Sequence, residues 1–205
     1  MKKQGFLSSR GETKMKTAAI LAVAGVAAAA AAQSITIDVA NPTLNPGEST
    51  TVTLSAGYGG TDYAIAGVGT NFISSVGSDG WSDLALVAPM NGPGTSAGAA
   101  SGTGVDGIIA GQLNFPLAGI YADDSNPIAF WTATYTAPAV VADAFTVDLS
   151  TRTSRFDVYV ARDQALSESR LADLREGQGA INVVPAPASL ALLGLGGLAA
   201  ARRRR

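Results

Sequence analysis

Apolar and polar residues alternate with a period of two over several short stretches of this chain. Residues 34–39 read Ser-Ile-Thr-Ile-Asp-Val, and residues 128–136 read Ile-Ala-Phe-Trp-Thr-Ala-Thr-Tyr-Thr. Such alternation, with β-branched and aromatic side chains, predicts half-buried strands. The predicted strands are residues 34–39, 50–54, 63–68, 81–87, 107–115, 128–136, 145–149 and 155–160. Short strands separated by turn residues predict a mainly β fold, an antiparallel sandwich.

The first two predicted strands are joined by a turn that contains Asn45-Pro46-Gly47. This strand–turn–strand opening resembles that of extracellular immunoglobulin-like or cohesin-like sandwiches, and a jelly roll is a related architecture. In residues 128–136 we expect Trp131 and Tyr135 to face the core. The glycine-rich residues 91–107 are predicted to be a long surface loop. Residues 150–154 are expected to be a polar turn between two strands.

Residues 163–176 carry the one helix-like pattern in the body, with leucines near helical spacing and Gly177 at the end. The alternative is a solvated spacer. The predicted organisation is therefore an N-terminal segment 1–32, a β-sandwich 33–162, a helical or flexible spacer 163–184 and a C-terminal segment 185–205.

The N-terminal segment has the order of parts of a secretory signal peptide. Lys14 and Lys16 precede an apolar run from residue 18 to residue 32, which predicts a signal helix. Ala30 and Ala32 fit the small-residue cleavage rule, so cleavage would leave Gln33 as the mature N-terminus. Met15 is an alternative start, because a complete signal follows it.

The C-terminal segment joins a proline motif, an apolar stretch and four arginines. The fourteen residues 188–201 are apolar or glycine except Ser189, and as a helix they span about 21 Å. A hydrocarbon core is about 30 Å thick, so this predicted transmembrane helix is short. Arg202, Arg203, Arg204 and Arg205 are expected to stop transfer through the membrane.

Pro185-Ala186-Pro187, the apolar stretch and the arginine cluster resemble the PEP-CTERM sorting signal. Ala186 stands where that signal usually has glutamate. The resemblance implies an exosortase, a membrane peptidase, as processing partner, and a transient stay in the inner membrane. It also implies delivery to the cell surface or to an exopolysaccharide matrix. A permanent single-pass anchor is the alternative.

Composition and charge exclude several kinds of chemistry for residues 33–184, called the body below. The chain has no cysteine and no histidine, which excludes disulfides, thiolate catalysis and histidine-based acid–base catalysis. Residues 33–184 contain five arginines, no lysine and fifteen acidic residues, a net charge of −10. A surface of this charge repels nucleic acid. We therefore expect no nucleic-acid partner.

Paired carboxylates are the strongest candidate chemistry in the body. Asp123 and Asp124 precede Ser125, Asn126 and Pro127, a pattern typical of a capped turn. A calcium site is the functional alternative, since oxygen-rich acidic loops suit that ion. Asp79 and Asp83, on either side of Trp81, form a second acidic loop of the same kind. We expect no cofactor.

Two functions remain open at this stage. The first is a non-enzymatic surface or matrix protein that serves adhesion or scaffolding, with polysaccharide as a possible partner. The alternative is a carbohydrate-binding or carbohydrate-active jelly-roll enzyme that uses two carboxylates. The aromatic residues available to contact a glycan are Trp81, Trp131, Tyr58, Tyr63, Tyr121 and Tyr135.

Overall fold

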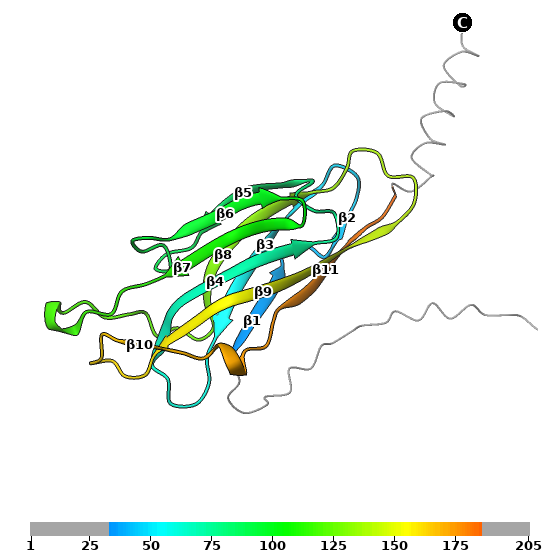
Figure 1. The fold of residues 1–205 in the computed structure, drawn as a ribbon. Helices are drawn as coiled ribbons and strands as arrows, with labels where there is room; N and C mark the ends of the chain where they lie inside the picture. Colours follow the sequence, from blue (N-terminus) through cyan, green and yellow to red (C-terminus); the bar gives the residue numbers. More distant parts are fainter. Residues whose placement is uncertain (1–32, 186–205) are drawn as a thin grey trace, which may run out of the picture.

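The computed structural model describes residues 33–185, which fold into two facing β-sheets (Figure 1). The predicted signal helix and the predicted transmembrane helix lie outside these residues. Within residues 33–185 the structure has no helix long and apolar enough to span a membrane. The strands and short 3₁₀ helices are β1 (Ser34–Val39), β2 (Thr43–Leu44), β3 (Ser49–Gly57), β4 (Ala64–Ser74), β5 (Trp81–Leu86), β6 (Ser96–Ser101), β7 (Gly104–Gly111), η1 (Pro116–Ala118), β8 (Ile128–Thr136), β9 (Phe145–Tyr159), β10 (Ser167–Ser169), η2 (Leu171–Asp173) and β11 (Gln178–Val183).

One sheet has four strands in the order β1-β3-β8-β5. The other has seven strands, in the order β2-β11-β9-β4-β7-β6, with β10 added beside β9. Every pairing between these strands is antiparallel except that of β2 with β11. The predicted mainly β, antiparallel sandwich is therefore confirmed.

The core lies between the sheets and follows the alternation seen in the sequence. In β3, Val52 and Leu54 are buried, while Thr51 is exposed and Thr53 is half-buried. Trp131 and Tyr135 of β8 are buried as predicted. Phe130 is buried as well, because the register of β8 against β3 shifts by one residue at this point. A bulge of this kind turns two successive side chains toward the same core.

The open edge of β1 is covered by another segment, and the edge strand β2 is very short. The backbone N–H of Ile35 donates to the carbonyl of Arg175 at 2.9 Å, and Arg175 N–H donates to the carbonyl of Gln33 at 2.8 Å. The segment before β11 thus occupies the open side of β1. The edge strand β2 has two residues and lies between Pro42 and Pro46. Short edges flanked by proline do not template further strands.

The edges of β5 and β6 are interrupted by irregular backbone. Gly98 in β6 has a φ of +82°, and the indole Nε1 of Trp131 donates to the carbonyl of Ala97 at 2.9 Å. Asp83 in β5 has a φ of +53°, and the register of β5 against β8 shifts next to it. Bulges and satisfied carbonyls remove the regular row of free groups that an incoming strand needs.

Two predicted connections are in fact strands. Residues 91–107, predicted as a surface loop, contain β6 and the start of β7. Residues 150–154, predicted as a turn, lie inside the 15-residue strand β9. Their polar side chains have a long-range partner: Glu176 accepts hydrogen bonds from Thr151 Oγ1 at 2.7 Å and from Thr153 N–H at 2.6 Å. Because the Glu176 carboxylate accepts these hydrogen bonds, the polar residues 150–154 can remain within strand β9.

The prediction of a helix or spacer over residues 163–184 is also wrong. Residues 163–176 contain only β10 and the single turn η2, and β11 then completes the larger sheet between β2 and β9. The helical stripe fails because its leucines do not share an environment. Leu174 packs against the core, whereas Leu166 is 83% exposed. The sandwich therefore continues to Val183.

Candidate functional site

The C-terminal segment 185–205, called the tail below, follows closely after β11. Val183 is paired with Phe145, the first residue of β9, and Val184 N–H donates to the carbonyl of Leu44 at 2.9 Å. Pro185 follows as the last described residue. The remaining predicted sorting and stop-transfer residues, and the predicted cleavage residues before Gln33, lie outside the described part of the chain. They are Ala186, Pro187, Arg202, Arg203, Arg204, Arg205, Ala30 and Ala32.

Gln33, the predicted mature N-terminus, is built into the fold. Its side chain is buried, and its Nε2 donates to Asp62 Oδ2 at 3.0 Å. Arg170 contacts the other oxygen of Asp62 at 3.2 Å. The start of the sandwich is thus tied to the segment before β11 through side chains as well as backbone.

The predicted acidic pair forms a turn. Asp123 Oδ1 accepts a hydrogen bond from Ser125 N–H at 2.8 Å. Hydrogen bonds from the Ser125 side chain and backbone hold the pKa of Asp123 below its ordinary value. The backbone carbonyl of Asp124 accepts from Tyr58 Oη at 2.8 Å. In the second acidic loop, Asp83 Oδ2 accepts from Ser82 Oγ at 3.1 Å. Across residues 33–185, no three acidic side chains converge in a way that could hold a metal ion.

The aromatic residues considered for a glycan surface serve mainly the core. Trp81 packs edge-on against Phe72 with centroids 4.8 Å apart, and its Nε1 donates to Ser74 Oγ. The hydroxyls of Tyr58 and Tyr63 donate to backbone carbonyls. Trp131 and Tyr135 are buried, as described above. Of the six candidates, only Tyr121 has about half of its surface exposed, at 46%.

A different cluster of exposed side chains lies in the connection between β7 and β8. Five large apolar residues here are each about half exposed or more, and we call them the apolar tip: Leu113, Phe115, Leu117, Ile120 and Tyr121. Leu117, in η1, is 97% exposed. In Figure 1 this connection projects from one end of the sandwich, and β11 ends at the other.

Buried amide side chains hold the base of the apolar tip through hydrogen bonds. Asn114, 3% exposed, donates from Nδ2 to the carbonyls of Arg162 at 3.1 Å and Gln164 at 2.7 Å. Its Oδ1 accepts from Ala122 N–H at 3.1 Å. The first two interactions join the connection to the segment after β9, and the third joins the two sides of the connection to each other. The connection is therefore fixed at its base.

Gln112 and Tyr159 complete this support. Gln112 Nε2 donates to the carbonyl of Ile65 at 2.7 Å, and its Oε1 accepts from Asp123 N–H at 2.7 Å. The Tyr159 hydroxyl donates to the carbonyl of Gln112 at 3.1 Å and accepts from Asn114 N–H at 3.2 Å. Tyr159 is the last residue of β9, so the end of the longest strand positions the tip.

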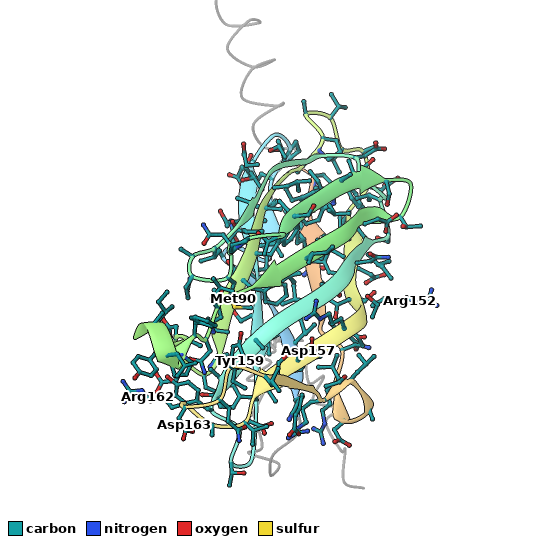
Figure 2. All side chains as sticks on the ribbon, turned by 60° about the vertical axis from the view of Figure 1, so that its left-hand side comes forward. Met90, Arg152, Asp157, Tyr159, Arg162 and Asp163 are labelled. Atoms are coloured by element: carbon teal, nitrogen blue, oxygen red, sulfur yellow. The ribbon has the colours of Figure 1, made fainter. Side chains whose placement is uncertain are left out.

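The tip itself is a small hairpin. Phe115 N–H donates to the carbonyl of Ile120 at 2.8 Å, and Ile120 N–H donates back at 3.2 Å. Gly119, with a φ of +71°, reverses the chain between them. The guanidinium of Arg162 lies 4.2 Å from the centre of the Tyr121 ring. Figure 2 shows Tyr159, Arg162 and Asp163 gathered at this end, while Arg152 projects elsewhere.

A hollow of about 230 Å³ lies beside the tip on the outer face of the larger sheet. Ile109 and Leu113 supply its apolar side, and Arg155, ion-paired with Asp157, supplies its charged side. Glycines form much of the remaining wall. At Gly92 a Cβ would lie 2.9 Å from the carbonyl oxygen of Gly111. A larger residue there would displace backbone, so the glycine keeps the two segments in contact.

The charge around the apolar tip is mainly negative. Asp123 and Asp124 follow Tyr121 in the chain, and Asp163 and the half-exposed Glu168 lie in the adjoining segment between β9 and η2. The cations of these segments are Arg162, which is stacked on Tyr121, and Arg170, which is ion-paired with Glu168. An apolar surface with an anionic border suits binding of a complementary surface better than catalysis.

The sequence contains one signal for the tip that the strand prediction overlooked. Leu113 and Phe115 alternate with polar residues at the end of the predicted strand 107–115. Pro116 and Gly119, just beyond, mark a turn. An apolar alternation that runs directly into a turn at the end of a sheet is the pattern of an exposed hairpin.

Comparison with known proteins finds a known motif at the C-terminus and a known fold in residues 33–185. Residues 183–205 match the model of the PEP-CTERM protein-sorting motif, which indicates export and a membrane-anchored intermediate. No curated protein matches the sequence.

Solved structures similar to the sandwich are cohesin modules. The seventh ScaB type I cohesin of Pseudobacteroides cellulosolvens has a TM-score of 0.53 and 11% identity, covering 76% of this chain and 94% of the cohesin. A cohesin module of a Clostridium perfringens family 33 glycoside hydrolase has a TM-score of 0.47 and 11% identity, covering 76% and 99%. The cohesin in the OlpA cohesin–dockerin complex of Clostridium thermocellum has a TM-score of 0.44 and 19% identity, covering 75% and 99%. The similarity to the Pseudobacteroides cellulosolvens cohesin, at a TM-score of 0.53, is one of fold.

Proposed function

We propose that this protein is a non-enzymatic binding module that serves adhesion or scaffolding at the cell surface or in an extracellular matrix. The observation that carries this proposal is the position of the sorting motif. It begins at residue 183, the last residue of β11, so the tail follows the sandwich without an intervening domain. The sandwich is therefore joined directly to a delivery signal.

The tail would act in three parts during delivery. Pro185 and Pro187 exclude helix, so they hold an extended segment of the kind that a peptidase cleft requires. Residues 190–201 would keep this segment at the membrane. The four terminal arginines would stop transfer, since each costs about 2.5 kcal/mol or more at the centre of a membrane. An exosortase-type membrane peptidase is the proposed processing partner.

Binding, rather than catalysis, is supported by the described side chains. The chain lacks histidine and cysteine. The Asp123 carboxylate accepts a hydrogen bond from Ser125 N–H within its own turn. The one ion pair beside a hollow, Arg155 with Asp157, joins opposite charges on neighbouring positions of β9. No observation favours the alternative of an enzyme with two catalytic carboxylates.

A protein is the partner that the exposed surface supports best. The tip offers mostly aliphatic side chains, whereas glycans are bound on exposed aromatic faces with polar groups beside them. Both tryptophans lie in or against the core. The cohesin-like fold agrees with protein binding, since one of the similar structures is described as a cohesin–dockerin complex.

The delivery half of this proposal is tested in cells by fractionation and intact-mass measurement. Wild-type protein should be shortened near Pro187 and released from the inner membrane. Pro187→Leu should extend the helix and leave the protein in the membrane, uncleaved. Changing all four terminal arginines to alanine should release unprocessed protein. Val140→Leu, at an exposed site in the body, serves as the control. A Pro187→Leu protein that is processed and released like the wild type would refute the sorting mechanism.

A further inference from the structure

We infer that the apolar tip docks a segment of a partner protein that has apolar anchor side chains and a basic border. This inference rests on the proposed function, because it specifies the partner of the binding module. Four observations support it: the amount of apolar surface exposed, the rigidity of its support, the hollow beside it and the charge around it.

The first observation is the exposed apolar area. A large aromatic side chain has about 150–250 Å² of surface, so Phe115 and Tyr121, about half exposed, each leave roughly 100 Å² in water. With Leu117 almost fully exposed and Leu113 and Ile120 half exposed, the tip presents on the order of 500 Å². The largest apolar patch of a typical monomer is about 300–600 Å² and often functional.

The second observation is that the tip is held in place before any partner arrives. Asn114, Gln112 and Tyr159 fix both ends of the hairpin through buried hydrogen bonds. The pair of hydrogen bonds between Phe115 and Ile120 fixes its middle. A surface that is already ordered loses little conformational entropy on binding. Leu117 is therefore presented outward by a rigid frame.

The third observation is the size of the hollow beside the tip. At about 230 Å³ it is smaller than the roughly 300–1,000 Å³ of sites that enclose a small molecule. It shares Leu113 with the tip. A hollow of this size accepts one side chain from a ligand that lies mainly elsewhere. The two features together fit a polypeptide lying across the tip with one anchor residue in the hollow.

The fourth observation is charge. Four acidic residues lie in the segments that border the tip, against two arginines: Arg162 is stacked on Tyr121, and Arg170 is ion-paired with Glu168. The body as a whole carries −10. Complementary charge speeds association and favours the correct partner, so the partner segment should carry lysine or arginine next to its apolar anchors. The acidic residues are Asp123, Asp124, Asp163 and Glu168.

Other occupants fit the tip less well. A second copy would bring two anionic borders together, which like-charge repulsion opposes. A membrane reached through the C-terminal segment fits less well, because that segment begins at the other end of the sandwich: Val183 is beside Phe145, whereas Tyr159, at the opposite end of β9, supports the tip. The interrupted sheet edges leave little backbone for a partner to extend as an added strand.

The test selects partner chemistry without presuming a partner. A random peptide library displayed on phage is panned on the purified exported protein, and selected peptides are synthesised for affinity measurement. We expect the selected peptides to combine aliphatic or aromatic residues with lysine or arginine. Leu117→Asp and Phe115→Asp should each weaken their binding by about tenfold or more. Val140→Asp adds the same charge at a site 88% exposed in another connection and should change affinity less than about twofold.

Several results would overturn the inference. Acidic selected peptides would contradict it, and so would an equal loss of affinity in Val140→Asp and Leu117→Asp. Sedimentation of the protein alone showing a dimer that Leu117→Asp dissociates would identify a second copy as the occupant. Binding to anionic lipid vesicles that depends on Leu117 would identify a membrane. Failure of the proposed delivery appears separately, in the fractionation of the Pro187→Leu protein, which no change at the tip should alter.

Discussion

Replacing Asn114 by alanine tests whether the tip is rigid because of its buried amide. The change removes three hydrogen bonds, two donated by Nδ2 and one accepted by Oδ1 from Ala122 N–H. Each is worth about 1 kcal/mol net, and a buried N–H left without a partner costs about 1–3 kcal/mol. The expected loss of unfolding free energy is about 2–4 kcal/mol, which lowers Tm by about 5–15 °C in a domain of this size.

The measurement combines urea unfolding with hydrogen exchange of individual amides. Asn114→Ala should lower the urea midpoint and should also speed exchange at Phe115 and Ile120, whose N–H groups close the hairpin. The matched control is Asn41→Ala at an exposed turn, where Asn41 Oδ1 accepts a single hydrogen bond from Thr43 N–H at 3.2 Å. It should cost no more than about 0.5 kcal/mol. An unchanged midpoint with unchanged exchange at both tip amides would refute the reasoning.

Two further predictions concern carboxylates. Glu176→Gln should lower stability by about 1–2 kcal/mol in thermal unfolding, because one charged acceptor of the hydrogen bonds from Thr151 and Thr153 is lost; Tm within 1 °C of wild type would contradict this. The pKa of Asp123 is lowered in the folded state by Ser125, so its contribution is present above the unfolded pKa of about 3.9 and is lost as pH falls through the lower folded value. A titration by NMR should show an Asp123 midpoint below 3.9 that rises in Ser125→Ala, and a midpoint at or above 3.9 in the wild type would be inconsistent.

The sequence predicted the bounds of a strand correctly where the strand's own residues carry the pattern. The predicted bounds of β1 and β8 match the structure at both ends, because each strand has one buried and one open side over its whole length. The prediction stopped β9 short because Thr151 and Thr153 look like turn residues on their own. Their partner, Glu176, is more than twenty residues away, and a window of local sequence does not include it.

The candidate site was harder to predict for a related reason. Apolar residues at strand spacing predict a core, and Leu113 and Phe115 have that spacing. What turns them outward is the set of buried polar contacts of Gln112, Asn114 and Tyr159, which come from three parts of the chain. The sequence showed the apolar residues and the turn, and the structure supplied the polar frame that keeps them in water.

The interrupted edges have a consequence for how densely such molecules can be stored. In a crowded matrix, a sandwich with regular open edges would join its neighbours side by side into growing β-assemblies, which are slow to reverse. Here β2 is short, β1 is covered, and β5 and β6 are bulged, so side-by-side pairing of strands is prevented. The net charge of −10 over residues 33–184 adds repulsion between molecules. On the proposed function, the protein would stay dispersed at high local concentration, and a partner would make contact by displacing water from Leu117 and its neighbours.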